Sequence, residues 1–278
     1  MIEKKYISTI NPYGDVINAD LRYKPDGNSS ALVMVAHGFK GFKDWGFMPY
    51  VGEQIAEHSL ISVVFNFSLN GNKNRTDLMI DVEDFRRNTI TRQREDFVLL
   101  AERLGSLMPP EIAQRWNGDI YLLGHSLGGG MCALVSKDIP QTKKIAVWGS
   151  ISHFCRYTRH QMDIWRRQGT MEFPNARTGQ TIAMDVGYIE DVMQNYPKNI
   201  LATTLASVNL PLLVVHGLQD VTVNVREARA LAESVRPELR NELIIEKTGH
   251  TFGVTHPFIG STPELELALK KTIEFYIK

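Results

Sequence analysis

Short apolar runs recur along the chain, and several are hydrophobic at almost every position. Residues Leu32–Ala36 read Leu-Val-Met-Val-Ala, and residues Leu212–Val215 read Leu-Leu-Val-Val. A strand that is covered on both faces, as in a parallel sheet, has this continuous pattern in place of alternation. The expected strands are Lys5–Ile10, Val16–Tyr23, Ala31–His37, Ile61–Phe67, Asp119–Gly124, Lys144–Gly149, Pro211–His216 and Glu242–Glu246.

The segments between these runs carry apolar residues at three- and four-residue spacing, which predicts helices. Strands that alternate with helices predict an α/β fold with a doubly wound, mostly parallel sheet and right-handed crossovers. Only residues 11–15, Asn-Pro-Tyr-Gly-Asp, separate the first two runs, so we expect an N-terminal antiparallel hairpin at the sheet edge. The expected helices are Phe47–His58, Thr89–Leu107, Leu127–Lys137, Val225–Val235 and Glu264–Tyr276.

One connection is much longer than a crossover helix requires. It runs from the apolar run that ends near Ser152 to the strand that begins at Pro211, whereas a crossover needs only about a dozen residues. Long excursions of this kind are usually lids or binding elements. The sequence therefore predicts a core domain made of residues 1–152 and 210–278, with a helical cap insertion over residues 153–209.

A G-x-S-x-G pentapeptide, Gly-His-Ser-Leu-Gly, occupies residues Gly124–Gly128. It follows the strand Ile120–Leu123 and opens the helix that begins at Leu127. A sharp strand-to-helix turn lifts the serine hydroxyl above the sheet, and flanking glycines avoid collisions with neighbouring elements. The helix N-terminus also directs free N–H groups at an anion that forms there. This context favours Ser126 as a nucleophile over a bystander serine in a glycine-rich turn.

A serine hydroxyl needs a general base, and the base needs an orienting acid. Of the eight histidines, His250 lies in the loop between the last strand and the last helix, at the edge of the sheet where Ser126 emerges. His256 lies in the same loop and is the second candidate. Asp220 follows the strand Leu212–Val215 and is the candidate acid. Its alternative role is to cap the helix that begins near Asn224.

The segment His37–Phe42, His-Gly-Phe-Lys-Gly-Phe, follows the strand Ala31–Ala36. Attack on an acyl carbon places negative charge on oxygen, and each N–H group aimed at that oxygen contributes about 3–4 kcal/mol. The backbone N–H groups of Phe39 and Leu127 are the candidate donors of such an oxyanion hole. A tight turn is the alternative for this segment, and it is compatible with that role.

These four motifs, in this order, resemble those of the α/β-hydrolase fold superfamily, and the resemblance extends from about Ala31 to Tyr276. Within it, the chain is similar to serine esterases with a helical cap, such as cinnamoyl (feruloyl) esterases and dienelactone-hydrolase-like proteins. The resemblance implies a catalytic triad of Ser126, Asp220 and His250, and it gives the two candidate oxyanion positions the same role. Dienelactone hydrolases themselves carry a cysteine nucleophile, so the chain departs from them at its serine.

We therefore expect a serine hydrolase that cleaves carboxylic esters of small or aromatic acyl groups through an acyl-enzyme intermediate. An aminopeptidase or amidase with the same triad is the alternative, and a cap carboxylate facing the serine would favour it. A non-catalytic binding protein on the same fold is the second alternative. The cap carboxylates are Glu172, Asp185, Glu190 and Asp191, and the candidate substrate-binding residues are Phe154, Tyr157, Trp165 and Tyr188.

The composition argues against several other classes of protein. Lys plus Arg and Asp plus Glu each number 31, so no net charge attracts a nucleic acid. The apolar runs are far shorter than the ~20 residues that cross a bilayer, and residues 1–10 lack a signal-peptide core. We expect a soluble, cytoplasmic protein that binds neither nucleic acid nor membrane.

Motifs for metals and nucleotides are missing from the sequence. It has no HExxH and no paired CxxC, and the glycines Gly128–Gly130 follow the serine instead of forming a GxGxxG or P-loop. We expect no metal and no cofactor. The expected partner is a small-molecule ester, and the oligomeric state is left open between a monomer and a homodimer.

Overall fold

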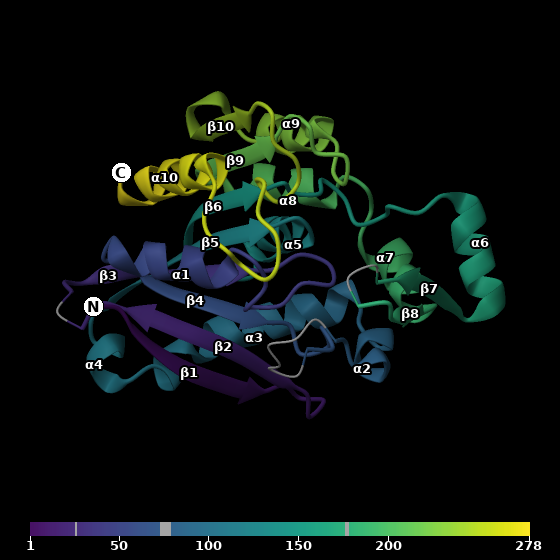
Figure 1. The fold of residues 1–278 in the computed structure, drawn as a ribbon, viewed down its shortest axis with the longest axis horizontal. Coiled ribbons are helices and arrows are strands. Elements are labelled where there is room, and N and C mark those ends of the chain that lie inside the picture. The colour runs from purple at the N-terminus through teal and green to yellow at the C-terminus, as the bar shows by residue number, and fades with distance from the viewer. Residues whose placement is uncertain (26, 73–78, 176–177) are drawn as a thin grey trace.

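A single mixed sheet and the helices packed on its two faces form the part of the molecule that we call the main domain (Figure 1). The computed structural model describes residues 1–25, 27–72, 79–175 and 178–278. Within these residues the sheet has eight strands in the order β1-β2-β4-β3-β5-β6-β9-β10. These strands are β1 (Glu3–Ile10), β2 (Val16–Tyr23), β3 (Ser30–Ala36), β4 (Ile61–Asn66), β5 (Trp116–His125), β6 (Thr142–Trp148), β9 (Leu212–Gly217) and β10 (Arg240–Ile245).

The strand directions confirm the predicted fold class. β1 pairs with β2, and β2 with β4, in antiparallel register, so the N-terminal hairpin lies at one edge of the sheet. Every other pairing in this sheet is parallel. The carboxyl ends of β3, β5, β9 and β10 therefore meet at one edge, where ligands bind in open α/β sheets.

Each face of the sheet carries its own hydrophobic cluster, because successive strand residues point to opposite sides. Leu32 and Met34 of β3 belong to one cluster, and Val33 and Val35 belong to the other. This double burial explains why β3 is apolar at nearly every position. The first cluster includes residues of α3 (Ile90–Leu107), α5 (Leu127–Val135), α8 (Ile200–Val208) and α9 (Val225–Glu233), and the second those of α1 (Met48–Glu57) and α10 (Pro263–Ile277).

Local signals fix where the long helices begin. The side chains of Thr89, Asn224 and Thr262 accept hydrogen bonds from backbone N–H groups in the first turns of α3, α9 and α10. Pro263 at the first position of α10 is preorganised for a helical start. The shorter helices, which we did not predict, are α2 (Val82–Arg86), α4 (Pro110–Ala113) and the 3-10 helix η1 (Pro237–Leu239).

The segment expected to be a helical cap contains a β-hairpin as well as helices. Figure 1 shows α6 (Arg159–Gln168) and α7 (Gly187–Asn195) beside the main domain, with β7 (Thr170–Pro174) and β8 (Thr181–Asp185) between them. β7 and β8 pair in antiparallel register. The helical expectation missed this hairpin because each of its strands is only 5 residues long.

Helix α8 lies against the main domain. Its buried residues Leu201 and Leu205 belong to the same cluster as α5, and Leu201 approaches the α5 backbone at Gly130. α8 therefore acts as the crossover helix that leads into β9. The division of the chain at residues 153 and 209 stays a prediction.

None of the helices in the described ranges has both the length and the hydropathy needed to span a bilayer.

Candidate active site

Ser126 sits on a strained turn between β5 and α5. Its φ of 58° and ψ of −120° are rare for a residue with a side chain, and such strain is typical of functional sites. The turn is held by the Ser126 N–H, which donates to the Trp148 carbonyl over 2.8 Å. A Cβ atom on Gly124 would lie 2.2 Å from the Gly128 carbonyl oxygen, and one on Gly128 would lie 2.3 Å from that of Ala36. Both flanking glycines are therefore required for close packing.

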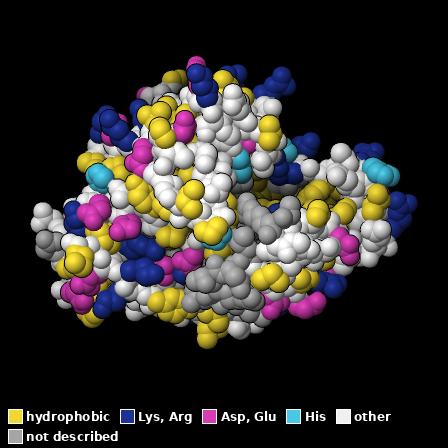
Figure 2. Space-filling model, viewed as in Figure 1, with side chains coloured by type: hydrophobic (Ala, Val, Ile, Leu, Met, Phe, Trp, Pro, Cys, Tyr) yellow, Lys and Arg dark blue, Asp and Glu magenta, His cyan; other side chains and the backbone are white. Residues whose placement is uncertain are grey.

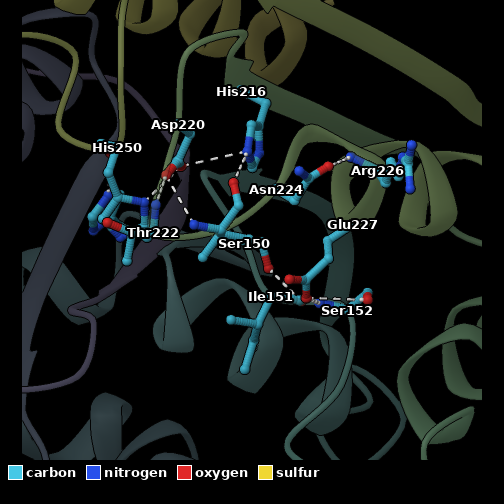
Figure 3. A network of polar contacts seen from close by, with 12 residues as sticks. Ser150, Ile151, Ser152, His216, Asp220, Thr222, Asn224, Arg226, Glu227 and His250 are labelled. Carbon is cyan, nitrogen blue, oxygen red and sulfur yellow. Dashed lines mark hydrogen bonds and ion pairs between the residues drawn. The ribbon is translucent and has the colours of Figure 1, made fainter. Parts of the chain in front are cut away.

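His250 and Asp220 form a hydrogen-bonded pair above the same edge of the sheet. The distance from His250 Nδ1 to Asp220 Oδ2 is 2.7 Å (Figure 3). The other carboxylate oxygen, Oδ1, accepts from the N–H groups of Thr222 and Val223 over 2.8 and 2.9 Å. Since Asp220 is buried and held on both oxygens, it fixes the imidazole orientation and places the proton on Nδ1.

Two opposing effects set the pKa of Asp220. Burial raises it, but the hydrogen bond from His250 and those from the Val223 and Thr222 N–H groups outweigh burial, so the pKa lies below its usual value. The carboxylate is therefore ionised at neutral pH. It does not cap α9, because the side chain of Asn224 accepts from the Arg226 N–H at that position.

The fully buried His216 lies beside the acid at the end of β9. Its Nε2 atom donates to the Val223 carbonyl over 2.9 Å and lies 3.4 Å from Asp220 Oδ2 (Figure 3). This contact was not predicted from the sequence. The signal available in the sequence was the position of His216 at the end of β9, four residues before the acid.

A buried histidine next to the serine holds the loop of the candidate base. The Nε2 atom of His125 donates to the His250 carbonyl over 2.8 Å, and the two rings lie 4.6 Å apart. Burial, with a smaller effect of His250, lowers the pKa of His125 to about 3, so its ring is neutral at pH 7. The other candidate base, His256, accepts from the Gly46 N–H and stacks on Trp45.

Ser126 and His250 line one small cavity of about 60 Å³ together with Trp45, Met48 and Thr251. Among the described residues, the serine hydroxyl makes no hydrogen bond to the imidazole. Hydrogen bonds between nucleophile and base are often long until substrate binds. The arrangement thus brings the two predicted groups to one cavity, and proton transfer requires them to close to hydrogen-bond distance.

The candidate oxyanion donors lie on either side of the serine. Leu127 is the first residue of α5, so its N–H has no acceptor within the helix. Phe39 lies in a turn that is closed by the Gly41 N–H donating to the Gly38 carbonyl, and its own N–H donates to no described residue. A Cβ atom on Gly38 would lie 2.9 Å from the Ser126 Cβ, so this turn packs directly against the nucleophile.

His37 and Asn70 support this turn. His37 Nδ1 donates to the Gly38 carbonyl over 2.9 Å, and Asn70 Nδ2 donates to His37 Nε2 over 3.3 Å. Burial lowers the pKa of His37 to about 4, which keeps the ring neutral and able to accept from Asn70. Asn70 was not among the predicted site residues. Its place just beyond β4, at the same sheet edge, was the available signal.

A larger cavity of about 240 Å³ opens beside Ser126 and is lined by Phe39 and Leu127 from the main domain. In Figure 2 the surface is hollowed where the segment containing α6 and α7 meets the main domain, and hydrophobic side chains gather there. The predicted residues Phe154, Tyr157 and Tyr188 line this cavity.

Trp165 requires a correction, because it does not line either cavity that contains the serine. It is completely buried one layer behind, stacked on Tyr188 with ring centroids 5.8 Å apart, and its Nε1 donates to the Met184 carbonyl. Arg156 also lines the larger cavity, where it was not predicted, although it lies near Phe154 and Tyr157 in the sequence.

The carboxylates that would favour an aminopeptidase lie elsewhere. Asp185 pairs with Arg86 over 3.0 Å, and Asp191 accepts from the N–H and hydroxyl of Thr91. Neither they nor Glu172 and Glu190 line a cavity with Ser126 in the described part of the chain. Across the same residues, no cluster of three or more His, Cys, Asp or Glu side chains could hold a metal ion.

Comparisons with known proteins find similarity in structure and not in sequence. No family model matches the chain. A search of curated proteins also gives no match.

Solved structures are similar over nearly the whole chain. A putative hydrolase from Agrobacterium vitis has a TM-score of 0.73 at 14% identity, with 99% of both chains covered. Est1E from Butyrivibrio proteoclasticus, in a structure with ferulic acid, has a TM-score of 0.67 at 19% identity, with 98% of both chains covered. A dienelactone hydrolase from Anabaena variabilis has 0.63 at 15% identity, covering 99% of this chain and 97% of that one.

At these identities the likeness establishes the fold. The chain has the α/β-hydrolase fold, and the predicted resemblance to this superfamily is confirmed. The activity, the substrate and the mechanism of this chain depend on its site.

Proposed function

We propose that this protein is a serine hydrolase that cleaves carboxylic esters through an acyl-enzyme intermediate. The observation that carries the proposal is the 2.7 Å bond between Asp220 and His250 at a cavity that also contains Ser126. A buried carboxylate, an imidazole and a serine on a strained turn are the three groups that nucleophilic acyl transfer needs.

In the first half-reaction, His250 Nε2 takes the proton of the Ser126 hydroxyl as the oxygen attacks the ester carbonyl. Asp220 stabilises the imidazolium that forms and is not itself protonated. The N–H groups of Phe39 and Leu127 donate to the oxyanion. The imidazolium then protonates the departing alcohol, and the acyl group remains on the serine.

In the second half-reaction, His250 removes a proton from water, which attacks the acyl-enzyme and releases the acid. The two cavities suggest how the ester lies. Of these two cavities, His250 lines only the 60 Å³ cavity. Because the general acid must face the leaving oxygen, the alcohol part of the ester points into this smaller cavity. The acyl group then occupies the 240 Å³ cavity beside Phe39 and Leu127.

The shape and walls of the larger cavity favour a small or aromatic acyl group. Phe154, Tyr157 and Tyr188 supply aromatic surface, and pockets of this kind bind apolar ligands with a few polar anchors. The likeness to Est1E, one structure of which holds ferulic acid, supports an aromatic acid as one candidate.

The test compares Ser126→Ala with Ser136→Ala on p-nitrophenyl acetate, together with an aminoacyl p-nitroanilide. Ser136 is a buried serine at the end of α5 whose hydroxyl donates to the Ala133 carbonyl, so it controls for loss of a helix-associated hydroxyl. We expect Ser126→Ala to lower kcat by about 10⁴-fold or more while Ser136→Ala remains active. Near-wild-type turnover by Ser126→Ala would refute the proposal, and faster anilide than ester cleavage would favour an amidase.

A further inference from the structure

Two tyrosine residues of the larger cavity have hydroxyls with no hydrogen-bonding partner among the described residues. Tyr157 and Tyr188 both line the cavity, and neither hydroxyl bonds to a described residue. Other buried phenols of the chain are partnered: Tyr276 donates to the Leu122 carbonyl over 2.8 Å, and Tyr196 bonds to the Thr91 hydroxyl over 2.8 Å. Since buried hydroxyls are nearly always satisfied, the unpartnered phenol of the buried Tyr188 needs an explanation, and the half-buried Tyr157 shares its cavity.

Tyr188 is buried and Tyr157 is half-buried, and neither hydroxyl is sealed. Tyr188 is only 6% exposed, yet neither phenol oxygen is among the fully enclosed polar atoms that lack a partner. A small group inside the cavity can therefore reach them. Burial raises the pKa of Tyr157 to about 12 and that of Tyr188 well above 10, so both remain protonated and can donate.

Packing behind the cavity holds the two rings in place. Trp165 is completely buried, stacks on Tyr188, and meets Tyr157 edge-on with ring centroids 5.1 Å apart. The Trp165 Nε1 bond to Met184 fixes the indole in turn. Donors held by this packing are preorganised to bind a ligand atom, because little side-chain freedom is lost when it arrives.

Charge decides which kind of acceptor these donors suit. Arg156 is the cation among the cavity residues, and its Nη1 donates to both carboxylate oxygens of Glu227 over 2.7 and 2.9 Å. Burial raises the pKa of Glu227, but the hydrogen bond from Arg156 and its charge outweigh this and keep the carboxyl ionised. The pair is neutral overall, so the site offers donors without net positive charge.

We propose that this cavity recognises an acyl group that carries a second, neutral hydrogen-bond acceptor, such as a keto or amide carbonyl, which accepts from Tyr157 and Tyr188. The inference rests on the proposed ester hydrolysis and specifies its substrate class. The ester carbonyl lies beside Ser126, Phe39 and Leu127, and the second carbonyl lies against Tyr157 and Tyr188 of the same cavity.

The experiment measures kcat/KM for matched p-nitrophenyl esters. Levulinate is compared with pentanoate, and the next two longer terminal methyl-keto acyl groups are compared with their saturated counterparts. The hydrogen succinate ester provides an anionic analogue. We expect at least one keto ester to react about tenfold faster than its saturated counterpart, since sites built to hydrogen-bond a group discriminate against analogues that lack it.

Tyr157→Phe and Tyr188→Phe remove the hydroxyls and keep the rings, and Tyr196→Phe is the matched control whose hydroxyl bonds outside the cavity. We expect each cavity variant to lower kcat/KM for the keto ester more than for pentanoate, so that the keto preference falls toward one. Tyr196→Phe should keep the preference. A merely structural role would lower both rates together.

Three results would overturn the inference. The first is that wild type hydrolyses the keto ester and its saturated counterpart at equal rates in all three pairs. The second is a keto preference that survives in the Tyr157→Phe/Tyr188→Phe double variant, and the third is a succinate ester that reacts about tenfold faster than the levulinate ester. If Ser126-dependent hydrolysis of p-nitrophenyl acetate persists in these cases, only the inference fails. If wild type hydrolyses no ester, the proposed function fails and the inference with it.

Discussion

The Nε2 atom of His125 donates a hydrogen bond over 2.8 Å to the main-chain carbonyl of His250. The residue that immediately precedes the candidate nucleophile thus anchors the backbone of the candidate base. This bond couples the turn after β5 to the loop after β10, two segments that are far apart in the sequence. The bond positions the His250 imidazole through the main chain and involves none of the ring atoms of His250.

Replacing His125 should therefore impair catalysis without removing a catalytic group. His125→Phe keeps a ring but loses the donor, and we expect kcat to fall by about 10–100-fold with a smaller change in KM, as for other small misplacements of reacting groups. His125→Gln retains an N–H donor and should recover part of the loss. Steady-state kinetics on one p-nitrophenyl ester tests this, and unchanged kcat in the phenylalanine variant would contradict it.

Asp220→Asn tests the orienting acid. The amide can occupy the same space but cannot accept from His250 Nδ1 in the way a carboxylate does, so the imidazole loses the tautomer that can act as a base. We expect kcat to fall by about 10⁴-fold, in line with the same change in other triads. The control is Asp138→Asn, which alters a carboxylate paired with Arg94 and should leave kcat unchanged. Similar activities for the two variants would exclude Asp220 from the triad.

Gly38→Ala tests the contact between the oxyanion turn and the nucleophile. The added methyl would lie 2.9 Å from the Ser126 Cβ and 3.2 Å from the His125 carbonyl oxygen, so the turn must shift. We expect kcat to fall by about 100-fold or more. Gly105→Ala in α3 is the control, since its nearest neighbour would be a Trp116 ring atom at 3.9 Å. If both alanine variants retain full activity, the turn does not hold an oxyanion donor against the serine.

The buried neutral His37 predicts a loss of stability in acid. Its pKa is about 4 when folded against 6.5 when unfolded, so between these pH values the unfolded chain binds the extra proton. The free energy of unfolding then falls by about 1.4 kcal/mol per pH unit from this group as the pH drops, and the group contributes no pH dependence above 6.5.

Urea denaturation of wild type and His37→Asn at pH 7 and pH 4.5 measures this effect. Asparagine cannot take up the proton. Between pH 7 and pH 4.5 the free energy of unfolding of the variant should therefore fall by roughly 2–3 kcal/mol less than that of wild type. The buried His125 makes the same contribution to the pH dependence of stability in both proteins, so this contribution cancels in the comparison. Identical losses in the two proteins would show that His37 is not held neutral in the fold.

The sequence predicted those parts of the fold that depend on local patterns. The apolar runs are strands because both faces of the sheet are covered, and the predicted hairpin at β1 and β2 is present. The β7–β8 hairpin escaped prediction because a pair of five-residue strands inside a long insertion carries little periodicity. Its signal is the alternation of Met171 and Phe173 with polar residues.

Tertiary contacts limited what could be predicted of the site. The pairing of Asp220 with His250 was predictable from chain order, because strand ends converge at one sheet edge. Trp165 was misplaced because aromatic composition does not tell a cavity wall from the layer behind it. Asn70 was missed because its role depends on the orientation of His37, which sequence alone does not give.

The central claim is that Ser126 is an activated nucleophile, and covalent labelling tests it most directly. An organophosphonate probe, followed by peptide mass spectrometry, should modify one residue, Ser126. Labelling should be absent in Ser126→Ala and much slower in Asp220→Asn. A wild-type protein that never reacts, or a label that persists at another residue in Ser126→Ala, would contradict the account.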